Sequence, residues 1–187
     1  MHNVVFSVFT GIDATVCFSA FSWGVRGHFR STGAMPLGMK ITSALSAALF
    51  AGFLWNIAHG LGGAWFLSIV LFTASLGVFA TAILASRRTP PTLAYDNDSP
   101  SFLLNHGPYR FVRHPFYLAY VLFWFGTAIA VHSLAGWVAP VLMTALYADA
   151  ATREERKFAT SELSAAYAAY RARAGMFWPR PLALLAG

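Results

Sequence analysis

Apolar residues recur along the chain in long stretches that contain few charges. Five of these stretches are long enough to cross a bilayer as a helix: residues 3–23, 41–58, 62–85, 116–132 and 134–150. Spanning the hydrocarbon core takes about 20 apolar residues, and a helix satisfies its backbone hydrogen bonds within the segment. The pattern therefore predicts an all-α integral membrane protein with five transmembrane helices.

The distribution of basic residues predicts how these helices are oriented. The connections 24–40 and 86–115 and the tail from residue 151 carry all 13 Lys and Arg residues. The two short connections between the other neighbouring stretches carry none. Because Lys and Arg concentrate in cytoplasmic loops, we expect the N-terminus outside and the C-terminus in the cytoplasm. We expect the inner membrane as the location.

The composition agrees with a membrane protein, since 57% of the residues are hydrophobic and 11% are charged, whereas soluble domains carry about 25% charged residues. The net charge of +6 requires no nucleic-acid partner, because positive-inside bias explains the basic clusters. No Lys or Arg precedes Arg26, so we expect the first stretch to be a retained helix and not a cleaved signal peptide. The single Cys17 forms no intrachain disulfide, and no metal-ligand spacing is present.

Beyond residue 150 the sequence becomes polar and rich in Ala, with Leu163, Tyr167 and Tyr170 at helical spacing. This spacing predicts a cytoplasmic amphipathic helix, which either continues the fifth span or folds back on the membrane surface. Pro140 lies inside the fifth predicted span and is expected to kink it, because proline removes a backbone donor.

A cluster of polar and aromatic residues, 103–117, precedes and enters the fourth apolar stretch. Pro115 is suited to the first turn of that helix, which needs no N–H from it. Arg113, His114 and Tyr117 would then lie within one turn of each other. Taken alone, this cluster also fits an interfacial anchor in which Arg and Tyr bind lipid headgroups.

A pair of carboxylates, Glu154 and Glu155, follows the fifth stretch on the same predicted side of the membrane. Adjacent helical residues project about 100° apart, so at most one of them is expected to face a site between the last two spans. The other can pair with Arg113 or Arg110. An isolated pair of this kind also fits a solvated helix face, but the two clusters together favour a functional site.

With these motifs the chain resembles the isoprenylcysteine carboxyl methyltransferases, together with the related phospholipid N-methyltransferases and their bacterial relatives. The matching residues stand in the family's order over the C-terminal half. They are Gly107-Pro108-Tyr109, Arg113-His114-Pro115-Phe116-Tyr117, Glu154-Glu155, Tyr167 with Tyr170, and Pro179-Arg180-Pro181. R-H-P-x-Y alone is moderately specific, and R-H-P-x-Y followed by E-E and Y-x-x-Y is strongly so.

The resemblance implies a methyltransferase that uses S-adenosylmethionine and a membrane-associated or hydrophobic acceptor, such as an isoprenylcysteine carboxylate. It implies one membrane domain over residues 1–187, in which 1–85 form a three-helix scaffold and 86–187 bind the cofactor on the cytoplasmic side. The implied catalytic residues are Arg113, His114 and Glu154. The implied cofactor-binding residues are Phe102, Leu103, Leu104, Tyr109, His114, Pro115, Phe116, Tyr117, Glu154 and Glu155.

The acceptor site departs from the family pattern. Eukaryotic prenylcysteine enzymes carry a substrate-binding arginine about one turn before the glutamates, and the matching residue here is Ala150. Arg153, next to Glu154, is therefore the candidate for binding the acceptor. Two other functions stay open: a phospholipid amine N-methyltransferase, and a non-catalytic membrane protein that binds a lipid or a partner helix.

Overall fold

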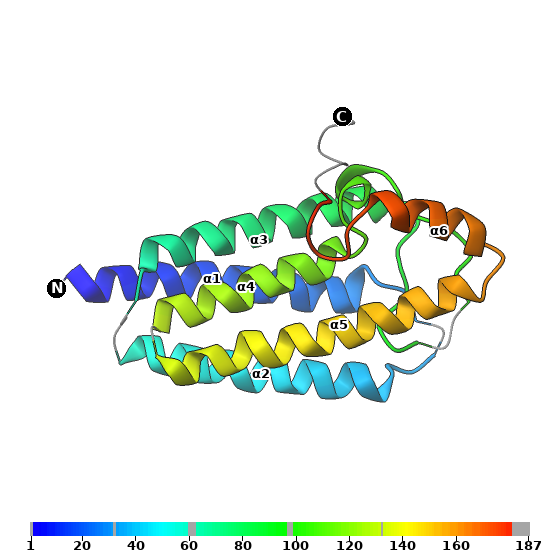
Figure 1. Ribbon diagram of the computed structural model, residues 1–187. Coiled ribbons are helices and arrows are strands. Elements are labelled where there is room, and N and C mark those ends of the chain that lie inside the picture. The colour runs from blue at the N-terminus through cyan, green and yellow to red at the C-terminus, as the bar shows by residue number, and fades with distance from the viewer. Residues whose placement is uncertain (1, 32, 60–62, 97–98, 132, 181–187) are drawn as a thin grey trace.

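The computed structural model describes residues 2–31, 33–59, 63–96, 99–131 and 133–180. Within these ranges the chain is helical and has no β-strand beyond two isolated bridges. The α-helices are α1 (His2–Gly27), α2 (Leu37–Ala58), α3 (Trp65–Ser86), α4 (Pro115–Val131), α5 (Val138–Ala159) and α6 (Ser164–Arg173). Short 3₁₀ helices, η1 (Gly107–Arg110) and η2 (Leu134–Trp137), precede α4 and α5. Helices α1 to α5 form an elongated bundle, and α6 lies at one end of it (Figure 1).

The predicted apolar stretches coincide with the bundle helices, although the predicted boundaries at residues 62 and 132 fall outside the described residues. Four helical stretches are long and apolar enough to cross a membrane: Val4–Gly27, Leu37–Ala58, Trp65–Ser86 and Leu134–Ala159. The all-α membrane class is therefore confirmed. Helix α4 has 17 residues, which is close to the lower limit of about 17–25 for a spanning helix. The count of five spans stays a prediction.

The fifth predicted stretch, 134–150, begins in η2 (Leu134–Trp137), and α5 continues without a break to Ala159. The chain beyond residue 150 thus first extends the fifth helix and then forms α6, a question that the sequence had left open. Pro140 lies in the first turn of α5, where its missing N–H breaks no intrahelical hydrogen bond, so the expected reason for a kink is absent. The longer helix carries Glu154 and Glu155 beyond the apolar part of the bundle on a continuous backbone.

Helix α4 occupies the centre of the bundle and contacts each of the other four bundle helices. Gly126 of α4 lies so close to Phe72 of α3 that an added Cβ would be 2.6 Å from the ring. The indole N–H of Trp124 donates a hydrogen bond of 3.1 Å to the Tyr147 hydroxyl of α5. Phe72 and Trp124 are buried. These contacts fix α4 against α3 on one side and α5 on the other.

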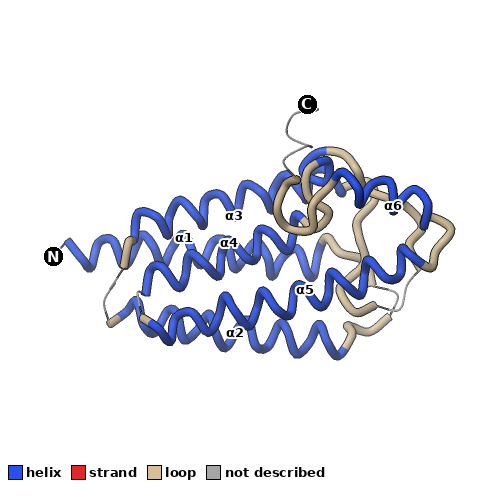
Figure 2. The backbone as a smooth tube through the Cα atoms, in the orientation of Figure 1, coloured by secondary structure: helices blue, strands red, loops and turns tan. Residues whose placement is uncertain are grey.

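Loops and α6 gather at one end of the bundle (Figure 2). The Arg30 N–H donates to the Pro91 carbonyl at 2.9 Å, and the Leu93 N–H donates to the Arg30 carbonyl at 2.8 Å. An isolated bridge joins Val112 to Gly175 in the tail after α6. The α1–α2 connection, the α3–α4 connection and the tail are therefore tied together where α4 begins and α5 ends.

Candidate active site

The tail after α6 holds the backbone of the first two polar residues of the site. The Arg113 N–H donates to the Gly175 carbonyl at 2.7 Å, and the His114 N–H donates to the Met176 carbonyl at 3.2 Å. Helix α4 begins at the next residue. The side chains of Arg113 and His114 therefore project from a backbone that is fixed on one side by the tail and on the other by α4.

The turn that precedes these residues depends on Gly107, whose φ is +58°. This left-handed conformation favours glycine, because a side chain there is strained. The turn leads into η1, in which Tyr109 is buried. The Tyr170 hydroxyl of α6 donates a hydrogen bond of 2.6 Å to the Tyr109 carbonyl, which secures the turn to α6.

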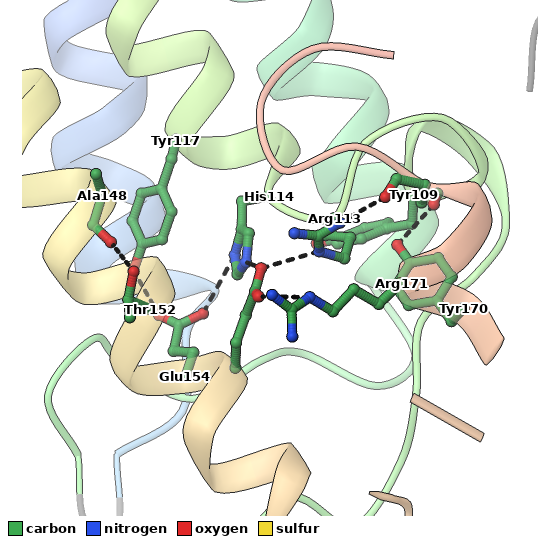
Figure 3. A network of polar contacts seen from close by, with 11 residues as sticks. Tyr109, Arg113, His114, Tyr117, Ala148, Thr152, Glu154, Tyr170 and Arg171 are labelled. Atoms are coloured by element: carbon green, nitrogen blue, oxygen red, sulfur yellow. Dashed lines mark hydrogen bonds and ion pairs between the residues drawn. The ribbon is translucent and has the colours of Figure 1, made fainter. Parts of the chain in front are cut away.

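Glu155 is the centre of an ionic cluster whose other members, Arg113, His114 and Arg171, are labelled in Figure 3. Its Oε1 accepts a hydrogen bond from Arg113 Nε at 2.9 Å and lies 3.2 Å from His114 Nε2. Its Oε2 lies 3.7 Å from Arg171 Nε on α6. The side chains of Arg113 and Glu155 are 6% and 8% exposed. This cluster joins the start of α4, the end of α5 and α6; Arg113 and Glu155 are buried in it, whereas the Arg171 side chain is 62% exposed.

Glu154 has a different environment from its neighbour. Its Oε1 accepts a hydrogen bond of 2.5 Å from the Tyr117 hydroxyl, and its Oε2 lies 3.5 Å from His114 Nδ1. The Glu154 side chain is 32% exposed. One glutamate of the pair thus binds the cationic cluster, and the other is accessible from outside the protein.

His114 lies between the two carboxylates, with one ring nitrogen facing each. Burial disfavours the charged imidazolium, but the hydrogen bonds and charges of Glu154 and Glu155 outweigh burial and raise the pKa of His114 above 6.5. Both ring nitrogens are donors in the charged form. In its charged form His114 can therefore donate one hydrogen bond toward each carboxylate.

A cavity of about 360 Å³ opens beside Glu154, a volume in the usual range of about 300–1,000 Å³ for small-molecule sites. The α1–α2 connection, the α3–α4 connection and helices α4, α5 and α6 contribute to its lining. The cavity is lined by these residues predicted from the sequence: Phe102, Leu103, Leu104, Tyr109, Arg113, His114, Pro115, Phe116, Tyr117 and Glu154. The structure thus brings together the two motifs that flank the last two bundle helices.

Two predicted site residues are not among those that line the cavity. Glu155 is occupied by the ionic cluster. Arg153 forms a 2.7 Å ion pair with Asp149, and its guanidinium lies 5.8 Å from the centre of the Tyr95 ring. The Arg153 side chain is 58% exposed.

Sequence reasoning missed several aromatic residues of the cavity wall: Phe29, Tyr95, Tyr120 and Tyr147. Tyr147 precedes Glu154 by two helical turns, and Tyr120 follows Tyr117 by about one, so helical spacing alone would have found both. Phe29 and Tyr95 come from connections, where no periodicity marks a shared surface.

Tyr167 and Tyr170 form the buried face of α6, with 5% and 3% of their surfaces exposed, and both line the cavity. The Tyr167 ring stacks on Phe158 with 4.6 Å between ring centres. Whereas the Tyr170 hydroxyl has a partner, the Tyr167 hydroxyl is buried and has no hydrogen-bond partner within the described part of the chain. Burial raises the pKa of both phenols, so both hydroxyls keep their protons.

Comparison with known families identifies one match. A family model described as phospholipid methyltransferase matches residues 66–165, which is more than half of the 187 residues. The matched region contains α3 from Phe66 onward, all of α4 and α5, and both polar motifs of the cavity. No curated protein and no solved structure gives a significant match.

Proposed function

The chain belongs to the phospholipid methyltransferase family, and we propose on that basis that it transfers a methyl group from S-adenosylmethionine to a membrane-associated or hydrophobic acceptor. One observation carries the proposal: the R-H-P-x-Y stretch at the start of α4 and Glu154 of α5 line the same cavity. A single small molecule in this cavity would contact both motifs.

The residues of the cavity fit the proposed methyl donor. S-adenosylmethionine has an aromatic adenine, a hydroxylated ribose and a charged amino-acid end, and it supplies an activated methyl group on a sulfonium sulfur when bound. The cavity offers the rings of Tyr109 and Tyr117 for stacking, the Glu154 carboxylate as an acceptor and the Arg113 guanidinium as a donor. We propose that these side chains hold and orient the donor.

The proposed contribution of the protein to catalysis is alignment of the reactants and exclusion of water. A carboxylate or thiolate acceptor needs no proton removed, whereas an amine acceptor needs a base. Glu154 is better placed for this than His114, because its carboxylate is partly exposed at the cavity, whereas both ring nitrogens of His114 face carboxylates. The two carboxylates favour the protonated form of His114, which would orient Glu154.

We propose that the cavity faces the cytoplasm, with five spans and the N-terminus on the outer side of the inner membrane. The loops that carry the Lys and Arg residues lie at the cavity end of the bundle, and the N-terminus lies at the other end (Figure 1). The positive-inside tendency supports this orientation. In this arrangement α4 would cross the membrane as one of the five spans, with a length of 17 residues at the lower limit for a spanning helix.

Titration of detergent-purified protein with S-adenosylhomocysteine tests the proposal, with thermal stability and calorimetry as readouts. Glu154→Gln is expected to weaken binding about tenfold or more, since a hydrogen bond to a charged group contributes about 1.5–3 kcal/mol. Glu162→Gln is the matched control, because Glu162 is exposed and does not line the cavity. Mass spectrometry of a lipid extract incubated with protein and donor would identify the methylated product.

Absence of any S-adenosylhomocysteine binding by the wild-type protein would contradict the proposal. If a lipid or a partner helix stabilised the protein under those same conditions, the non-catalytic alternative would replace it. Equal weakening by Glu154→Gln and Glu162→Gln would leave donor binding in place but remove the proposed site.

A phospholipid amine is a second candidate acceptor, in addition to an isoprenylcysteine carboxylate. Tyr117 and Tyr147 stack with 5.6 Å between ring centres beside Glu154, and aromatic faces next to a carboxylate suit a cationic amine. At the position of the family's substrate arginine, Ala150 lines the cavity and offers no cation for a carboxylate. If a phospholipid amine is the acceptor, expressing the protein in a host that lacks methylated ethanolamine lipids should make these lipids appear. Lipid extracts identical to those of the host without the protein would count against this acceptor.

A further inference from the structure

The tail after α6 carries two adjacent aromatic residues that face in opposite directions. Phe177 points into the protein, where its ring centre lies 6.3 Å from that of His114 and 6.4 Å from that of Tyr117. Trp178 points outward and is 66% exposed. The tail therefore packs against the site with one ring and presents the next ring to its surroundings.

The contacts of the tail place Trp178 beside the first turn of α4. The His114 N–H donates to the Met176 carbonyl at 3.2 Å, and α4 begins at Pro115. The chain turns tightly after Gly175, because a Cβ added there would be 1.7 Å from the Trp178 carbonyl oxygen. In Figure 1 the tail turns back beside the start of α4, where the apolar bundle meets the loops. Trp178 thus stands at that boundary.

Exposed tryptophans occur at both ends of the bundle. Trp55 near the end of α2 and Trp137 in η2 are 70% and 40% exposed, at the end away from the cavity. At the cavity end, Trp23 near the end of α1 is 57% exposed. Indole rings concentrate at the two membrane–water interfaces, because one part of the ring is apolar and the N–H is polar. Trp178 has the position and the exposure of a second interfacial indole at the cavity end.

Basic side chains flank Trp178 in the tail. Arg173 at the end of α6 and Arg180 are both exposed. Arg180 Nη1 donates a 2.8 Å hydrogen bond to the Ala172 carbonyl, which brings the two ends of the tail together. Arginines next to a membrane are attracted to anionic lipid headgroups. An outward indole between two such cations suits the headgroup layer of a bilayer.

We propose that Trp178 inserts into the lipid–water interface and thereby holds the tail against the start of α4. The tail carbonyls accept the backbone N–H groups of Arg113 and His114, so a movement of the tail reaches both residues directly. Trp178 does not line the cavity and is in this proposal a positioning residue. The lipid contact does not depend on which molecule the cavity binds, so it goes beyond the proposed function.

Fluorescence of the full-length protein in lipid nanodiscs tests where the indole lies. The emission of Trp178 is the difference between the wild type and Trp178→Phe, recorded in phosphatidylcholine with and without bromine on the upper part of the acyl chains. Bromine quenches an indole that it contacts, so this emission should lose most of its intensity in the brominated lipid. Trp55→Phe provides the matched comparison from the other end of the bundle and should show similar quenching.

Two results of the fluorescence experiment would overturn the proposal. Emission that brominated lipid leaves unchanged and that a water-soluble quencher removes would place the indole in water. Emission that neither quencher reduces would place it against protein, in a contact with a second copy or another chain. Both measurements are made without a methyl donor, so their outcome is independent of methyl transfer.

Amide hydrogen exchange in the same nanodiscs tests the positioning role. Trp178→Ala should speed the exchange of the Arg113 and His114 amides several-fold, because their acceptors lie in the tail. Trp178→Phe keeps an aromatic ring and should restore part of the protection, whereas Trp55→Ala should leave both amides at the wild-type rate. Wild-type exchange in Trp178→Ala would overturn the positioning role even where lipid quenches the indole.

Discussion

Replacement of Glu155 by glutamine should destabilise the protein strongly, whereas the same replacement at the adjacent Glu154 should not. Glu155 is 8% exposed and is bound by Arg113 at 2.9 Å and by His114 at 3.2 Å. Removing one partner of a buried ion pair costs about 3–5 kcal/mol, because the other charge stays buried without compensation. Glutamine keeps one acceptor oxygen, so we expect a loss of about 3 kcal/mol, at the lower end of that range.

The expected change in unfolding temperature follows from the size of the chain. For domains of about 150–250 residues, 1 kcal/mol shifts the midpoint by about 2–4 °C, so Glu155→Gln should lower it by about 6–12 °C. Glu154 is 32% exposed and its main contact is the Tyr117 hydroxyl. Because glutamine still accepts that hydrogen bond, Glu154→Gln should cost less than about 1.5 kcal/mol and should act mainly on ligand affinity.

Thermal unfolding of both variants in one detergent, with and without S-adenosylhomocysteine, measures the two effects separately. The double replacement Arg113→Leu with Glu155→Leu is a further control, because removing both buried charges should restore part of the stability lost in Glu155→Gln. An unchanged midpoint for Glu155→Gln would refute the reasoning. A loss of stability in Glu154→Gln as large as in Glu155→Gln would refute it equally.

Three further predictions concern pH, packing and the tail. The folded-state pKa of His114 is raised above 6.5, so its charged form stabilises the protein fully below that pH. This stabilisation is lost as the pH rises through the folded-state pKa. Unfolding midpoints should therefore fall with rising pH more in the wild type than in His114→Gln. Gly126→Ala places a Cβ 2.6 Å from the Phe72 ring and should cost about 1–3 kcal/mol, and a wild-type midpoint would contradict the close α3–α4 contact. Gly175→Ala places a Cβ 1.7 Å from the Trp178 carbonyl oxygen, so the tail must shift, and S-adenosylhomocysteine affinity should fall while helix content by circular dichroism stays constant.

Long apolar stretches predicted the bundle well, because contact with lipid demands apolar residues over a whole helix. They did not predict the end of α5, since residues 151–159 are polar and a hydropathy pattern marks only the part of a helix that lies in lipid. The sequence left open whether the amphipathic segment continues the fifth span or folds back. In the structure α5 continues to Ala159, and a separate helix, Ser164–Arg173, follows the turn.

The candidate site was predictable where its residues share a helix or a motif. Adjacent glutamates project in different directions, and the structure indeed directs Glu155 to Arg113 and leaves Glu154 at the cavity. The contributions of Phe29 and Tyr95 were not predictable, because each lies in a connection whose path depends on distant contacts. Tyr95 adopts a φ of 65°, a left-handed conformation that is uncommon for tyrosine and that its sequence position does not indicate.

In the proposed function one cavity serves two ligands of different polarity, and the length of α5 accounts for this. The extra turns carry Glu154 past the apolar part of the bundle, where the loops and α6 surround it with polar groups such as Arg113. The same cavity reaches apolar side chains of the α1 and α2 ends, including Val25 and Met39. A water-soluble methyl donor would therefore meet the polar wall and a hydrophobic acceptor the apolar one. Had α5 ended at residue 150, its carboxylates would not stand at the junction of the two walls.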